Sequence, residues 1–123
     1  LNTEAGVGHG EYRGGFGLLR EYEILNDDTY TYCNIGRSIA KPWGINGANE
    51  GTNNYMIITS NEEEKRVTRI PSTKLKKGDT LKIVTGSGGG FGNPIQRKRE
   101  NILDDIENDF ISKDVAQKVY NFK

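Results

Sequence analysis

Glycine clusters constrain what this chain can fold into more than any other feature of its sequence. Of its 123 residues 16 are glycine, and the densest clusters are RGGFG at 13–17 and GSGGGFG at 86–92. Glycine lets two backbone segments approach closely and tolerates positive φ angles. The second cluster lacks the Lys and Ser/Thr of a P-loop, does not fit GxGxxG, and is followed by Pro94 rather than directly by a helix. We therefore expect packed backbone, with ligand contact by exposed amides as the less favoured alternative.

Charge and hydropathy exclude several classes of protein. Lys plus Arg number 17 and so do Asp plus Glu, whereas nucleic-acid binders and polybasic membrane-surface proteins need excess cations. Only 33% of residues are hydrophobic, and the mean hydropathy is −0.72. This composition predicts a thin core and apolar faces that something else covers, so the isolated chain is expected to self-associate or to be marginally stable.

Cys33 and His9 are the only residues of their kinds. A single cysteine cannot form an internal disulfide, which favours a cytoplasmic location. The pair is too sparse for a transition-metal site, which draws on several clustered ligands, so we expect no metal held by this chain. We interpret Cys33 as a buried structural thiol. No apolar run is long enough to span a membrane, and the polar start shows no signal peptide.

Strand patterns dominate the first three quarters of the chain. Alternating or apolar stretches bounded by turn residues predict strands at 18–25, 29–36, 54–60, 66–70 and 80–85. Between them we expect a long loop around Trp43, a solvated charged turn at 61–66 and a tight turn at 77–79.

Helical periodicity replaces this pattern after Pro94. Ile102, Leu103, Ile106 and Phe110 fall on one helical face, and Ser112 suits the N-cap of a last helix with the stripe Val115, Ala116, Val119 and Tyr120. The fold class is therefore α+β and mainly β. We expect a glycine-rich antiparallel or mixed sheet, or a barrel-like unit, over 1–95, then two short C-terminal helices over 96–123, in a single domain.

Two arginines flank the first glycine cluster. A guanidinium beside flexible backbone suits a ligand carboxylate or a partner's acidic side chain, although an internal ion pair is somewhat favoured. The basic stretch 96–100 is interpreted as a solvated patch whose cations pair with Asp104 and Asp105. Residues assigned to contact with substrate, phosphate or a partner are Arg13, Gly14, Gly15, Arg20, Gly88, Gly89, Gly90 and Phe91. No catalytic residue is assigned.

Four motifs in this order resemble the C-terminal end of the hydantoinase B/oxoprolinase family. An RGG-x-G-x-x-RE-Y pattern is matched by Arg13 to Tyr22. The other matches are Pro42-Trp43-Gly44 with Gly47 and Gly51; Gly78-Asp79 with Thr85, Gly88 to Gly90, Phe91, Gly92 and Pro94; and Asp105-Ile106 with Ile111-Ser112, Ala116 and Tyr120. Departures from the pattern are Ser87, Asn93 and Asp109.

The resemblance implies the C-terminal portion of a much larger chain that is inactive alone. Family members work with a hydantoinase A-like subunit that binds ATP, and together they open cyclic amides such as hydantoins or 5-oxoproline, while relatives carboxylate ketones. ATP and a divalent metal are implied for the full complex, with the catalytic groups in the N-terminal part. The partners implied are the remainder of the chain and the A-like subunit.

Two alternatives remain open from the residues. The first alternative is a stand-alone binding or adaptor module for a small anion or peptide. The second is a subunit that exists naturally as a separate polypeptide. The genomic reading frame discriminates between them. An upstream coding region with His and Asp clusters favours the enzyme portion, and an initiator Met just before Leu1 favours the module.

Overall fold

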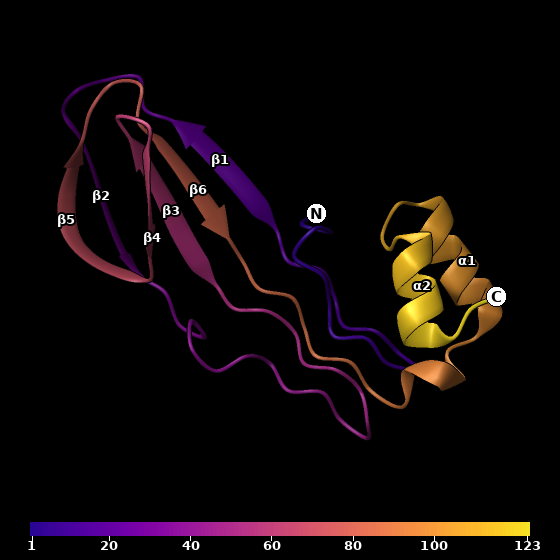
Figure 1. The fold of residues 1–123 in the computed structure, drawn as a ribbon. Coiled ribbons are helices and arrows are strands. Elements are labelled where there is room, and N and C mark those ends of the chain that lie inside the picture. The colour runs from indigo at the N-terminus through magenta and orange to yellow at the C-terminus, as the bar shows by residue number, and fades with distance from the viewer.

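The computed structural model describes all residues from 1 to 123 and is elongated rather than spherical. Figure 1 shows β-strands gathered at one end and two helices at the other, with long extended segments running between them. The strands and helices therefore do not form a single layered core. This shape follows from the glycine-rich composition of the middle segments, as described below.

Four strands form an antiparallel sheet in the order β1-β6-β3-β4. Their bounds are β1 Leu19–Glu23, β3 Tyr55–Ser60, β4 Glu63–Val67 and β6 Thr80–Val84. Both β1 and β4 are free edges, so the sheet does not close, and the barrel-like alternative is wrong. The antiparallel, mainly β prediction with two C-terminal helices is confirmed.

A second, two-stranded sheet pairs β2, Thr29–Asn34, with β5, Arg69–Leu75. Met56, Val67 and Leu75 are the buried side chains contributed by β3, β4 and β5. Tyr30 and Tyr32 are exposed, in keeping with the alternation of β2. Cys33 is only half-buried, so the prediction of a buried thiol is wrong.

The charged stretch 61–66 is mostly strand, contrary to the expected solvated turn. Only Asn61 and Glu62 form the turn, both with positive φ, and β4 begins at Glu63. Charged residues are acceptable there because β4 is an edge strand with exposed side chains. The strand expected at 66–70 spans the bend between β4 and β5.

Extended segments at 8–17, 42–52 and 85–92 run beside one another and are here called the glycine bundle. They are joined by backbone hydrogen bonds, such as Gly8 N to Gly88 O at 3.0 Å and Gly90 N to Asn49 O at 3.0 Å. A methyl group at Gly90 would lie 2.6 Å from the carbonyl oxygen of Gly8, far inside van der Waals contact. Only glycine permits this spacing, so the prediction of packed backbone is confirmed.

The helical end comprises a 3₁₀ turn, Pro94–Gln96, and the helices α1, Arg99–Glu107, and α2, Lys113–Tyr120. Ser112 caps α2 as predicted, because its Oγ accepts a hydrogen bond from the N–H of Val115 at 3.2 Å. The helices enclose a small core of their own, made of Ile102, Ile111, Ala116 and Tyr120. Leu103 is exposed, and Phe110 lies beyond the end of α1, so the predicted stripe of α1 is only partly correct.

The solvent-accessible surface is large for the size of the chain. It measures 8187 Å², whereas a globular protein of 13.7 kDa exposes about 6,600 Å². The excess of about 1,600 Å² reflects the elongated shape, and 20 of 123 residues are buried. The prediction of a thin core is confirmed. Neither helix is long and apolar enough to cross a membrane.

Candidate functional site

Asp105 is the centre of a buried polar junction between the glycine bundle and the helical end. Its carboxylate, on α1, is 1% exposed. Arg13 donates to it from Nε, at 3.1 and 3.0 Å, and from Nη2 at 2.9 Å. Arg97 donates from Nη2 at 2.8 Å. One carboxylate therefore ties together a bundle segment, the residue that follows the 3₁₀ turn, and α1.

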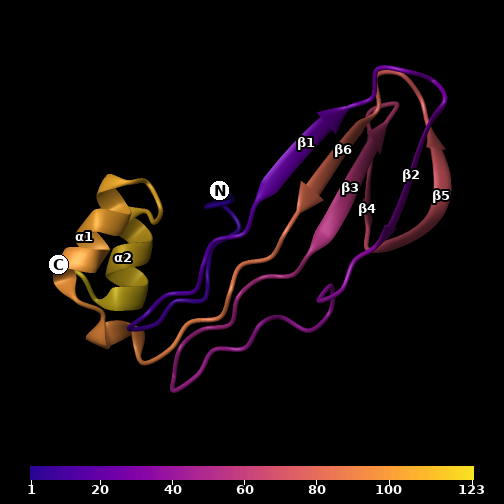
Figure 2. The ribbon, with the colours of Figure 1, turned by 180° about the vertical axis from the view of Figure 1, so that it is seen from behind.

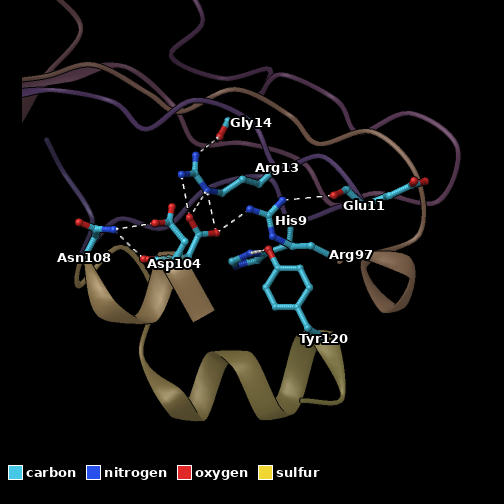
Figure 3. A network of polar contacts seen from close by, with 9 residues as sticks. His9, Glu11, Arg13, Gly14, Arg97, Asp104, Asn108 and Tyr120 are labelled. Carbon is cyan, nitrogen blue, oxygen red and sulfur yellow. Dashed lines mark hydrogen bonds and ion pairs between the residues drawn. The ribbon is translucent and has the colours of Figure 1, made fainter. Parts of the chain in front are cut away.

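Both arginines make further contacts within the chain. Nη1 of Arg97 donates to the carbonyl oxygen of Glu11 at 3.2 Å, and its side chain is 8% exposed. Figure 3 shows Arg97 lying between Glu11 and the ring of Tyr120. The guanidinium of Arg13 lies 4.8 Å from the ring centre of Phe16. Arg97 is thus an internal anchor, which corrects the interpretation of 96–100 as a wholly solvated patch, while its pairing with Asp105 is as expected.

His9 and Tyr120 form a second polar contact in the junction. His9 Nδ1 lies 2.7 Å from Tyr120 Oη, and Figure 3 shows the imidazole above the phenol. Burial, followed by the positive charge of Arg97, lowers the pKa of His9. Burial raises the pKa of Tyr120 to about 12. At neutral pH the hydrogen bond therefore joins an uncharged imidazole to an uncharged phenol.

A pocket of about 320 Å³ lies beside His9, between the first residues of the chain and the α1–α2 turn. Its walls include Val7, Phe16 and Phe110, and Glu4 and Asp109 also line it. The charged groups of Arg13 and Arg97 are committed to Asp105, and His9 is hydrogen-bonded to Tyr120. The arrangement is suited to holding the helical end in place.

Seven of the eight predicted contact residues lie in the glycine bundle, and six of these, all but Phe91, are packed closely together there. Gly14 packs on the backbone of Gly88, and Gly88 N donates to Gly15 O at 2.9 Å. Gly89 and Gly90 pack on the carbonyls of Trp43 and Gly8, while Arg13 leads from the bundle into the junction. For Arg13, the internal ion pair favoured from sequence is confirmed.

The other two predicted contact residues differ in their surroundings. Phe91 forms bridges with Tyr12 and Ile45 and is partly exposed at the far end of the bundle. Arg20 lies on β1, where its backbone pairs with Ile83, and its side chain makes no hydrogen bond or ion pair. Arg20 is therefore separate from the junction and its charge is uncompensated.

The bundle offers little to a phosphate. The amides of Gly8, Gly14, Gly88 and Gly90 already donate to backbone carbonyls, so they do not form an anion cradle. These four glycine amides are therefore not available to a phosphate. The chain has no group of three His, Cys, Asp or Glu residues that could hold a metal ion.

Sequence reasoning missed the His9–Tyr120 contact and the burial of Arg97. The two members of the first pair are 111 positions apart, and no periodicity links them. The available signal for the junction was Asp105, an acidic residue between Ile102 and Ile106 on the apolar face of a predicted helix, which requires a cationic partner when buried.

The open sheets, the glycine bundle and a helical end tied by internal ion pairs define a β-rich module whose charged junction serves its own packing. The chain belongs to the hydantoinase B/oxoprolinase family, because the model of that family matches residues 1–94. The resemblance seen in the sequence motifs is thus confirmed.

Relatives in sequence include a protein assigned as the B-type component of a D-/L-hydantoinase of Pseudomonas sp. strain NS671, 33% identical over 114 residues. The alignment covers 90% of this chain and 19% of that protein. An uncharacterized protein of Methanocaldococcus jannaschii is 31% identical, over 100% of this chain and 22% of the relative. 5-Oxoprolinase 1 of Arabidopsis thaliana is 32% identical, and the alignment covers 72% of this chain and 7% of the relative. The chain thus spans about a fifth of the first two relatives.

Two solved structures are similar in fold. ATP-dependent caprolactamase from Pseudomonas jessenii superposes with a TM-score of 0.74 at 25% identity, over 91% of this chain and 20% of that one. Nucleotide-free acetone carboxylase superposes with a TM-score of 0.66 at 20% identity, and the superposition covers 94% of this chain and 20% of the carboxylase chain. The second comparison concerns the fold alone.

Proposed function

We propose that this chain is the C-terminal scaffold and subunit-interface portion of an ATP-dependent cyclic-amide hydrolase of the hydantoinase/5-oxoprolinase type. In this proposal residues 1–123 form a single domain of a longer hydantoinase B-like polypeptide. The domain is inactive alone and contributes no catalytic residue. Its partners are the remainder of that polypeptide and an A-like ATP-binding subunit in the cytoplasm, and ATP and the divalent metal bind outside this domain.

The large surface is the observation that carries the proposal. An excess of about 1,600 Å² means that the chain is less compact than a globular protein of its mass, so much of its surface is available for contact with other parts of a larger protein. Part of it is a row of neighbouring side chains, Tyr12, Phe91 and Ile45, placed on adjacent segments by two β-bridges. Residues opposite one another in such bridges project to the same side, and all three are exposed. The row is suited to packing against other parts of a larger assembly.

The polar junction supports a scaffolding role for the same reason. Arg13 lies beside the glycine cluster and belongs to the sequence motif of the family, and it binds Asp105 of the same chain. The junction fixes the helices relative to the bundle and leaves no charged group free for chemistry. This chain covers only about a fifth of the length of its first two relatives, which supports a role as one part of a larger enzyme.

Turnover assays test the proposal. The purified chain is mixed with ATP and hydantoin, 5-oxoproline or caprolactam, and release of ADP and ring opening are measured. No turnover is expected from the chain alone, whereas the complete gene product with its A-like partner is expected to turn over one of these substrates. Robust turnover by the 123 residues, or a reading frame that encodes no more than these residues, would contradict the proposal.

A further inference from the structure

Strand β1 presents an unpaired backbone edge. Thr85 N donates to Leu18 O at 2.9 Å, and Ile24 N donates to Asp79 O at 2.9 Å. Hydrogen-bonded positions alternate along an antiparallel pair, so the amides and carbonyls of even-numbered residues from 18 to 24 point toward β6. The backbone groups of Leu19, Glu21 and Glu23 therefore point outward. Figure 2 shows β1 along the outer side of the sheet.

The two edges of the sheet differ in how they are protected. At the opposite edge, the exposed residues of β4 are all charged, from Glu63 to Arg66, and charged side chains discourage further pairing. Along β1 the exposed residues are mixed: Arg20, Glu21 and Glu23 are charged, while Leu19 is 43% and Tyr22 46% exposed, and Leu25, just after the strand, is 67% exposed. The β1 edge therefore leaves apolar surface in water that an added strand would cover.

The start of the chain shows how a strand meets this edge. Asn2 N donates to Gly17 O at 2.8 Å, and the two residues form an antiparallel bridge. Gly17 is the next outward position before Leu19. Because the bridge is antiparallel, any residues joined before Leu1 in extended form would run alongside β1 toward Glu23. The N-terminus lies beside the start of β1 in both ribbon views.

We propose that an extended segment of the longer hydantoinase B-type polypeptide, immediately upstream of Leu1, pairs antiparallel with β1 as a fifth strand of this sheet. This inference rests on the proposed function, because it requires that longer polypeptide. The main-chain groups of Leu19, Glu21 and Glu23 provide the hydrogen bonds. Arg20 provides side-chain selectivity, because it has no ion pair and would face the residue opposite it, which we expect to be acidic.

Hydrogen exchange of the β1 amides tests the proposal. Exchange is measured in the 123-residue chain and in the complete gene product. The amides of Leu19, Glu21 and Glu23 are expected to exchange rapidly in the short chain and at least about tenfold more slowly in the complete product. Arg20 and Tyr22, which bond to β6, are protected in both. Equal, rapid exchange of the outward amides in both proteins would overturn the inference.

A matched pair of proline variants of the complete product separates edge pairing from general stability. Glu21→Pro and Glu64→Pro each remove one outward amide, from β1 and β4 respectively, and proline is tolerated at such positions. Glu21→Pro is expected to accelerate exchange at Leu19 and Glu23 by about tenfold, the equivalent of one lost hydrogen bond. Glu64→Pro is expected to change it less than about twofold. Equal effects of the two variants would contradict the proposal.

Two other outcomes have definite meanings. Protection of β1 that appears in the short chain only as its concentration rises would show that a second copy occupies the edge, and would overturn the choice of occupant. A gene product limited to these 123 residues would refute the proposed function as well. A longer, active product with an unprotected β1 would refute this inference alone.

Discussion

The Nη2 of Arg13 lies 2.9 Å from the Oδ1 of Asp105, although the two residues are 92 positions apart in the sequence. Arg97 reaches the second oxygen of the same carboxylate. The helical end is thus joined to the glycine bundle through one buried acidic group that serves two cations. Removing the negative charge leaves both cations uncompensated at low exposure, which is more costly than losing a surface ion pair.

Asp105→Asn is therefore expected to lower the free energy of unfolding by about 3 kcal/mol. Urea denaturation followed by circular dichroism measures the change. Asp104→Asn is the control, because Asp104 is the exposed neighbour on the same helix, and it is expected to cost less than about 0.5 kcal/mol. Similar losses for the two variants would show that the junction is not an anchor.

Gly14→Ala and Gly15→Ala are expected to differ sharply although the residues are adjacent. A methyl group at Gly14 would overlap the backbone carbonyl of Gly88, whereas one at Gly15 would have nothing within 4 Å. We expect Gly14→Ala to cost about 2 kcal/mol or more and Gly15→Ala to change stability by less than about 1 kcal/mol. Thermal denaturation of the two variants checks this. Equal stability would mean that the bundle is not closely packed at Gly14.

His9 makes stability depend on pH in a defined direction. Its pKa in the folded chain is lowered from 6.5 by burial, so below pH 6.5 the unfolded chain binds more protons than the folded chain. The stabilising contribution of the neutral imidazole is complete above that pH and is lost as the pH falls toward the folded-state pKa. Unfolding free energies at pH 7.5 and 5.5 are compared with those of His9→Gln. The wild type is expected to lose more, and an equal loss would exclude the effect.

Tyr120 is expected to ionise at a higher pH than a tyrosine in water. Its pKa is raised to about 12 by burial, so the phenol stays protonated through the pH range in which ordinary tyrosines ionise, near 10. Ultraviolet titration of the folded chain should show a late component that Tyr120→Phe removes. The raised pKa contributes stability that is complete below pH 10 and is lost as the pH rises toward 12. A wild-type titration identical to that of the variant would refute this assignment.

Local chemistry was sufficient to predict most of the elements. The Ser112 cap and the stripe of α2 depend on neighbours within one helical turn, and the strands at 29–36, 54–60 and 80–85 alternate or are bounded by turns. The prediction for 61–66 is wrong because a run of charged residues usually indicates a solvated turn. Here the positive-φ pair Asn61 and Glu62 makes a tight hairpin, and the remaining charges occupy a strand with no outer neighbour.

The junction was less predictable because it depends on distant pairs. An internal ion pair is the favoured alternative for Arg13, and the cations of 96–100 are expected to pair with Asp104 and Asp105, but the sequence does not show that Arg13 and Arg97 both bind the buried carboxylate of Asp105. The His9–Tyr120 contact arises only when the bundle brings the first residues against α2. The glycine clusters are correctly predicted to be packing elements, because their spacing does not fit the phosphate-binding motifs. The sequence does not show which segments supply the carbonyl oxygens that accept hydrogen bonds from their amides.

The glycine bundle connects the sheets to the helices, and its three segments are held to one another by main-chain hydrogen bonds. A displacement of the helices is transmitted to the sheet through peptide groups rather than through interlocking side chains. Most positions facing away from the bundle can therefore vary without altering how firmly the two ends are coupled. The few positions without a Cβ cannot vary, and they set the distance between the two ends.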